Sequence, residues 1–188
     1  MIKVGFICEG KTERKIVESE AFQLFLKSID IDCIDEIIDA KGNGNLLPQY
    51  LGGFVDTLLD FGAQKICILT DLDNDACITL TKNRIDEKKE YLLIVAVKTS
   101  EAWFLSDSFS LCMAKVLKMD SFYFEHPEKV NALDKISELL FEKTGRGASD
   151  KKKLVAMMLN NGFNINAAAA HPNCNSAKYF VEKLKALA

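Results

Sequence analysis

The pattern of hydrophobic and polar positions divides the chain into two regions of different character. In the first, short apolar runs of strand length alternate with longer stretches that have helical spacing. Four runs predict β-strands, at 2–8, 33–38, 65–70 and 91–97. The run at 65–70 is the strongest of these predictions because continuously apolar, β-branched runs are typical of strands buried on both faces. Two stretches with apolar residues on one side predict helices, at 12–28 and 46–60.

Strands that alternate with helices predict βαβ units with right-handed crossovers, and so an α/β fold. We expect a mostly parallel sheet of about four strands with helices on both faces. From residue 100 onward only helical spacing remains, at 102–105, 111–117, 130–141 and 153–159. Ser176 is placed to cap a final helix with an apolar stripe. The sequence therefore predicts an α/β core over 1–99 and a helical region over 100–188 that packs on it as one compact unit.

Composition and charge narrow the class of protein. The chain has 188 residues, of which 48% are hydrophobic and 27% charged, as in globular domains. The formal net charge is -3, but an acidic average leaves room for a local basic face that binds nucleic acid. No apolar run approaches the roughly 20 residues of a membrane-spanning helix, and the first run is strand-like rather than a signal segment. We therefore expect a cytoplasmic protein that does not engage a membrane.

The six cysteines fit that expectation. They form no C-x-x-C pair, and Cys8, Cys67 and Cys112 lie in apolar runs, where a thiol behaves as a small hydrophobic side chain. They are interpreted as reduced core residues.

Acidic residues follow three of the predicted strands. Glu9 follows the first strand, Asp71 and Asp73 follow the strand at 65–70, and Glu101 follows the strand at 91–97. The carboxyl ends of parallel strands lie at one edge of a sheet, where functional residues gather. Carboxylates held close together repel one another unless a cation joins them, and hard oxygen ligands suit Mg²⁺ or Mn²⁺. The pattern therefore predicts a metal site at this edge.

Several of these positions also have plain structural interpretations. Glu13 falls in the first turn of a predicted helix, where the helix dipole favours a carboxylate in any case. Asp75 is interpreted as a helix cap rather than a ligand. A calcium loop that starts at Asp71 is excluded, because its sixth and twelfth positions are Ala76 and Lys82, where an EF-hand needs Gly and Glu.

Two short motifs, taken in order and in their strand context, resemble a known family. The first strand is followed by Glu9-Gly10-Lys11-Thr12-Glu13, and a later strand by Asp71-Leu72-Asp73. This arrangement resembles the TOPRIM domain of topoisomerases, bacterial primases and OLD-type nucleases. With the segments at 41–45, 100–105 and 176–180, the chain is most similar to small stand-alone TOPRIM-like proteins. These include RloB-like families, which are often associated with phage defence.

The resemblance implies roles for individual residues. Glu9 would be a metal ligand and acid/base group, and Asp71 and Asp73 would be a metal-binding pair. Glu13 would be the additional acid of a two-metal site, and Glu101 a further ligand. Glycines allow a phosphate to approach the backbone closely. The groups expected to contact phosphate or nucleic acid are Gly10, Lys11, Lys41, Gly42 and Lys178.

The resemblance implies an Mg²⁺- or Mn²⁺-dependent nuclease or phosphodiesterase that acts on DNA or RNA in phage defence. An ATPase on a separate chain and a homodimer are the partners that this implies. The alternative is a non-catalytic regulatory or binding module for nucleotide, RNA or a partner ATPase. The chain departs from the TOPRIM proteins it resembles, because it is too short for a topoisomerase and lacks the zinc-binding cysteines of primases. Its basic surface is also thin for a nuclease.

Overall fold

The computed structural model describes residues 1–86, 89–107, 112–148 and 150–188. These residues form two compact units, one of Met1–Ala96 with Glu182–Ala188 and the other of Val97–Val181. The division lies close to the predicted boundary between residues 99 and 100, although the closing residues 182–188 belong to the first unit. The packing of the helical region on the core stays a prediction.

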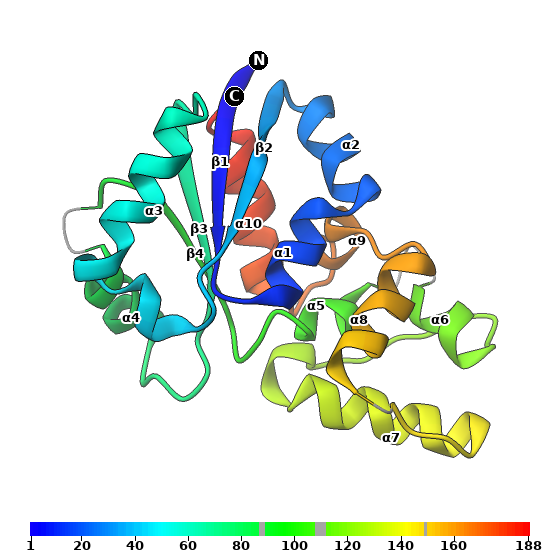
Figure 1. Cartoon of the computed structure of the whole chain (residues 1–188). Helices are drawn as coiled ribbons and strands as arrows, with labels where there is room; N and C mark the ends of the chain where they lie inside the picture. The colour runs from blue at the N-terminus through cyan, green and yellow to red at the C-terminus, as the bar shows by residue number, and fades with distance from the viewer. Residues whose placement is uncertain (87–88, 108–111, 149) are drawn as a thin grey trace. The chain divides into compact units, whose positions relative to one another are not determined.

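The first unit is built on a four-stranded, all-parallel sheet, as the alternating pattern predicted (Figure 1). Its strands are β1 (Ile2–Cys8), β2 (Ile31–Asp39), β3 (Lys65–Asp71) and β4 (Leu92–Ala96), in the order β2-β1-β3-β4. Strand β2 begins earlier than its apolar pattern indicated, because Ile31 and Asp32 pair with the first residues of β1. The central strands β1 and β3 are buried along most of their length, as their continuous apolar runs predicted.

Helices cover both faces of this sheet. On one face Ile7 and Ile68 join a buried cluster with Leu51 and Leu58 of α3 (Pro48–Asp60). Gly5 permits this close approach, since a Cβ there would lie 3.0 Å from Leu58. On the other face the ring of Phe6 packs edge to face against Phe22 of α2 (Glu20–Ser28), with centroids 5.9 Å apart. Figure 1 shows α3 and α2 on opposite sides of the sheet.

The helical prediction at 12–28 is corrected in one respect. The structure has two helices there, α1 (Lys11–Glu18) and α2, separated by Ser19 in an extended conformation. The hydroxyl of Ser19 accepts the backbone N–H of Phe22 and caps α2. Serine side chains commonly bond nearby backbone groups in this way, and such bonds compete with a continuous helix. The other helical elements of this unit are the 3₁₀ turn η1 (Asn43–Leu46) and α4 (Ile78–Ile85).

The second unit is helical throughout its regular structure, as the change of pattern after residue 100 predicted. Residue 111, which began one predicted helix, lies outside the described residues. A short helix at 165–169 was not predicted, because it is largely an alanine run with little amphipathic pattern. The elements are α5 (Ala102–Ser106), α6 (Cys112–Leu117), η2 (Pro127–Lys129), α7 (Ala132–Thr144), α8 (Lys151–Asn160), α9 (Ile165–Ala169) and α10 (Asn175–Lys185), whose last residues belong to the first unit.

The predicted cap of the final helix was wrong. Helix α10 begins at Asn175, so Ser176 lies inside its first turn. The carboxylate of Glu128 accepts the backbone N–H groups of Asn175 and Ser176 at 3.1 and 2.8 Å. The Ser176 hydroxyl accepts the indole N–H of Trp103 at 2.8 Å. Glu128, which is remote in sequence, therefore accepts the first backbone N–H groups of α10. The Ser176 hydroxyl instead binds the buried indole of Trp103.

Two further expectations concern the whole chain. Among the described residues, none of the helices has the length and apolar character needed to cross a membrane. All six cysteines are free thiols, and Cys8, Cys67 and Cys112 are buried as predicted. Burial raises the pKa of the Cys112 thiol to about 12, so this thiol stays protonated and unreactive at neutral pH.

Candidate functional site at the carboxyl edge of the sheet

The strand order creates a topological switch point between β1 and β3. From β1 the chain moves outward to β2, and from β3 it moves outward in the other direction to β4. In open parallel sheets, ligands bind beyond the carboxyl ends of the strands at such a point. Glu9 directly follows β1 and Asp71 is the last residue of β3. The two predicted acids therefore flank the place where this architecture binds ligands.

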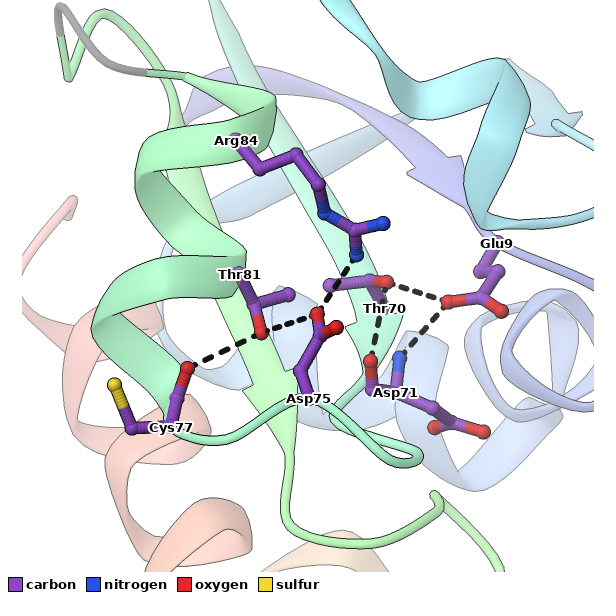
Figure 2. Close-up of polar contacts among 7 residues, drawn as sticks. All are labelled: Glu9, Thr70, Asp71, Asp75, Cys77, Thr81 and Arg84. Carbon is purple, nitrogen blue, oxygen red and sulfur yellow. Dashed lines mark hydrogen bonds and ion pairs between the residues drawn. The ribbon is translucent and has the colours of Figure 1, made fainter.

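Hydrogen bonds across the switch point hold Glu9 in place (Figure 2). Its Oε2 accepts the backbone N–H of Asp71 at 3.1 Å and the hydroxyl of Thr70 at 2.5 Å. The backbone N–H of Glu9 donates to the Leu69 carbonyl at 2.8 Å and continues the hydrogen-bond ladder between β1 and β3. Thr70 is fully buried and Asp71 is only 7% exposed. In Figure 2 the Glu9 and Asp71 carboxylates both lie to the right of Asp75 and Arg84.

The loop after β2 lies directly beside Glu9. Backbone N–H groups of Ala40 and Gly42 donate to the carbonyls of Cys8 and Glu9, each at 2.8 Å. Lys41 and Gly42 both have positive φ, 60° and 117°, and the second value suits only glycine. Lys41 is exposed, so its ammonium can reach an anion that approaches Glu9. The structure thus brings two predicted phosphate-contacting residues, Lys41 and Gly42, to the predicted acid.

The start of α1 also meets this site. Gly10 is the N-cap of α1, and its backbone N–H donates to Oε2 of Glu13 at 3.0 Å. Glu13 is buried, whereas Lys11, the first residue of the helix, is exposed. The contact from Gly10 is the one that a capping glutamate makes. The structural interpretation of Glu13 is therefore supported, and its role as a second-metal acid stays a prediction.

The loop after β3 carries Asp73 and is tied to α4. Asp73 is exposed and has a positive φ of 49°. The loop is closed by the Asp75 N–H, which donates to the Leu72 carbonyl at 2.9 Å. Oδ2 of Asp75 accepts the Thr81 hydroxyl and an Arg84 N–H, both at 2.8 Å (Figure 2). The prediction that Asp75 caps a helix was wrong, because the N-cap of α4 is Cys77 and Asp75 binds side chains of that helix.

The predicted Mg²⁺ or Mn²⁺ site at this edge has two carboxylates, those of Glu9 and Asp71, as its candidate ligands. Across 1–86, 89–107, 112–148 and 150–188, no group of three or more His, Cys, Asp or Glu side chains is placed to hold a metal ion. Mg²⁺ commonly uses one or two carboxylates and completes its shell with water and substrate phosphates. Glu9 and Asp71 supply such a pair of hard oxygen ligands. Metal binding by these two residues, and the participation of Asp73, stay predictions.

Glu101 and Lys178 belong to the second unit. The Glu101 carboxylate is completely buried, and its Oε1 lies 2.7 Å from Nζ of Lys151. A buried carboxylate needs such a counter-charge, because its desolvation is costly. Lys178 is exposed on α10. The predicted roles of Glu101 as a further ligand and of Lys178 as a phosphate contact remain predictions.

Two features of the site were missed at the level of sequence. Thr70 supplies a hydroxyl to Glu9 from the last buried position before Asp71. Thr81 and Arg84 hold the loop that follows β3. In an apolar, β-branched run, a threonine looks like any other strand residue. Only the hydrogen bond from Thr70 to Glu9, which the fold creates, distinguishes it. The Asp75–Arg84 contact depends on how α4 folds back toward the strand end.

The chain was compared with protein-family models, curated proteins and solved structures, and none of them matches it. The fold itself is α/β with a four-stranded parallel sheet. The relation to TOPRIM proteins stays a resemblance of short motifs, and the function is argued from the site.

Proposed function

We propose that this protein is a divalent-metal-dependent phosphodiesterase that cleaves DNA or RNA at the carboxyl edge of its sheet. The observation that carries the proposal is the hydrogen bond from the Asp71 N–H to the Glu9 carboxylate across the β1–β3 switch point. It ties one acid of the predicted site to the strand end that bears the other. The same edge carries the exposed side chains of Lys11 and Lys41.

Glu9 and Asp71 are the residues that would hold Mg²⁺ or Mn²⁺. A metal at such a site lowers the pKa of a bound water and stabilises the leaving oxygen of an in-line displacement. Thr70 and the Asp71 N–H orient the Glu9 carboxylate. Lys11 and Lys41 attract the phosphate backbone, and Gly42 leaves room for it beside the loop. Acids thus lie at the centre of the site and cations at its edge.

This distribution of charge makes metal dependence a strict expectation. Two carboxylates without a cation repel a phosphodiester, whose own charge is negative. The lysines are exposed, so their attraction for phosphate is screened by salt. We therefore expect substrate binding to weaken as salt rises, and cleavage to require the divalent ion at every salt concentration.

The experiment is a cleavage assay on the full chain with labelled single-stranded DNA, duplex DNA and RNA, in Mg²⁺, Mn²⁺ or EDTA. Glu9→Gln and Asp71→Asn keep side-chain size but remove a charged ligand, and we expect each to abolish cleavage. Asp60→Asn is the matched control, because Asp60 is an exposed acid at the end of α3. This variant should cleave as the wild type does.

Cleavage that persists in EDTA, or in both site variants, would overturn the proposal. Mn²⁺ binding at Glu9 and Asp71 without cleavage of any nucleic acid would instead support the alternative. The protein would then be a regulatory or binding module for nucleotide, RNA or a partner ATPase. The phage-defence role, the separate ATPase and the homodimer belong to this proposal. Co-purification from the native host tests the two partners, and survival of a phage challenge tests the defence role.

A further inference from the structure

The two oxygens of the Glu9 carboxylate have different surroundings. Oε2 accepts hydrogen bonds from the Thr70 hydroxyl and the Asp71 N–H. Among the described residues, no hydrogen bond or ion pair engages Oε1. Glu9 is half-buried, so Oε1 keeps access to a ligand. Hydrogen bonds therefore hold one oxygen of the carboxylate, and the other oxygen stays accessible to a ligand.

We infer that Thr70 is a positioning residue that directs Oε1 of Glu9 toward the metal ion, so that Glu9 binds it through one oxygen. The inference rests on the proposed function, because it concerns the same metal site. Thr70 itself touches neither metal nor substrate in this arrangement. Its hydroxyl, with the Asp71 N–H, fixes the orientation of the ligand.

The burial of Thr70 gives this contact its effect. The side chain is fully buried at the end of β3, so its hydroxyl needs a partner and Glu9 provides it. Hydrogen bonds to a charged acceptor are shorter and stronger than those between neutral groups. Because a glutamate has three rotatable side-chain bonds, an unfixed Glu9 would sample several orientations and lose ligand geometry. Loss of such an outer partner typically lowers metal affinity or activity about 10- to 100-fold.

The test measures Mn²⁺ affinity by calorimetry and Mn²⁺-dependent cleavage on the full chain. Thr70→Val removes the hydroxyl and keeps the shape, and we expect Mn²⁺ affinity to fall about 10- to 100-fold. Thr70→Ser keeps the hydroxyl and should stay within about threefold of the wild type, since the donor to Glu9 remains. Thr57→Val is the matched control, because the Thr57 hydroxyl bonds a carbonyl within α3, at Gly53.

One measurement separates positioning from a general structural effect. Saturating Mn²⁺ should restore most of the kcat of Thr70→Val, because excess metal offsets weakened affinity. If Thr70→Val does not fold, Thr70→Ser and Thr70→Ala replace it, since they differ only in the hydroxyl.

Equal Mn²⁺ affinity in the variants with and without the hydroxyl would overturn the inference and leave the proposed function standing. A wild-type protein that neither binds Mn²⁺ nor cleaves would overturn the proposed function, and this inference with it.

Discussion

The carboxylate of Glu9 accepts the backbone N–H of Asp71 at 3.1 Å, although the two residues are 62 positions apart in the sequence. The contact joins the end of β1 to the end of β3, where the strand order reverses. It also places a half-buried acid beside a buried one, and two like charges repel one another.

Asp71→Asn should abolish the stabilisation of the protein by Mn²⁺. A ligand at about 100 times its dissociation constant adds about 2.7 kcal/mol to the free energy of unfolding, and the wild type should gain this through Glu9 and Asp71. The metal-free variant should be as stable as the metal-free wild type or slightly more so, because repulsion from Glu9 is reduced. Thermal melting with and without Mn²⁺ measures both effects. Unchanged Mn²⁺ stabilisation in the variant would contradict the metal site.

Glu13→Gln should cleave nearly as well as the wild type. The side-chain amide oxygen of this variant can still accept the N–H of Gly10, which Glu13 accepts at 3.0 Å, so the start of α1 is preserved. Glu13→Ala should lower the free energy of unfolding by about 1 kcal/mol, because that N–H loses its partner. Urea unfolding and initial cleavage rates measure the two effects. Loss of most activity in Glu13→Gln, with one metal still bound, would show a second-metal acid instead.

Thr81→Val should destabilise the protein more than Arg84→Met, although both side chains bond Asp75. Thr81 is fully buried, so its loss leaves an acceptor partly unsatisfied and should cost about 1–2 kcal/mol. The Arg84–Asp75 pair is more than one-third exposed on each side, and such pairs contribute at most about 1 kcal/mol. Equilibrium unfolding in urea ranks the two variants. The reverse order would show that the ion pair, rather than the hydroxyl, holds the loop after β3.

His171 should make the second unit less stable in mild acid. Its ring is buried, its Nδ1 accepts the Asn173 N–H at 3.1 Å, and it stacks on Tyr123. Burial lowers the pKa of His171 in the folded protein. As the pH falls below the unfolded-state pKa of about 6.5, His171 binds a proton in the unfolded chain before it does so in the folded chain. The protein therefore loses free energy of unfolding as the pH falls through this range.

The measurement compares melting temperatures between pH 7.5 and 5 for the wild type and His171→Gln. The wild type should lose more stability than the variant over this interval, because the other titrating groups are common to both. His126→Gln is the control, since the His126 side chain is 44% exposed and its charge is a minor cause of the lowered His171 pKa, so this variant should keep most of the wild-type dependence. Equal pH dependence in the wild type and His171→Gln would remove His171 as the cause.

The strands of the first unit and helix α3 could be predicted from the sequence because they depend on local pattern, whereas helix α4 was not predicted. Continuous apolar runs identify β1 and β3, and the spacing of apolar residues identifies α3. Acids that follow strands could be assigned to one edge, because all parallel strands end on the same side. A break within an amphipathic pattern is harder to predict, and Ser19 shows why. Its hydroxyl donates to the Ile16 carbonyl at the end of α1 and accepts the Phe22 N–H at the start of α2.

Contacts between distant segments were decided by the tertiary structure alone. The order β2-β1-β3-β4 places Glu9 next to Asp71, and many other strand orders fit the same pattern of runs. Glu128 caps α10 and Lys151 pairs with buried Glu101, although their neighbours in sequence carry no sign of either contact. The spacing of hydrophobic residues can be read from a short stretch of sequence. The partner of a polar group depends instead on which distant segments folding brings together. For this protein, the sequence determined the strands and the acids at their ends, and the tertiary structure determined what holds those acids in place.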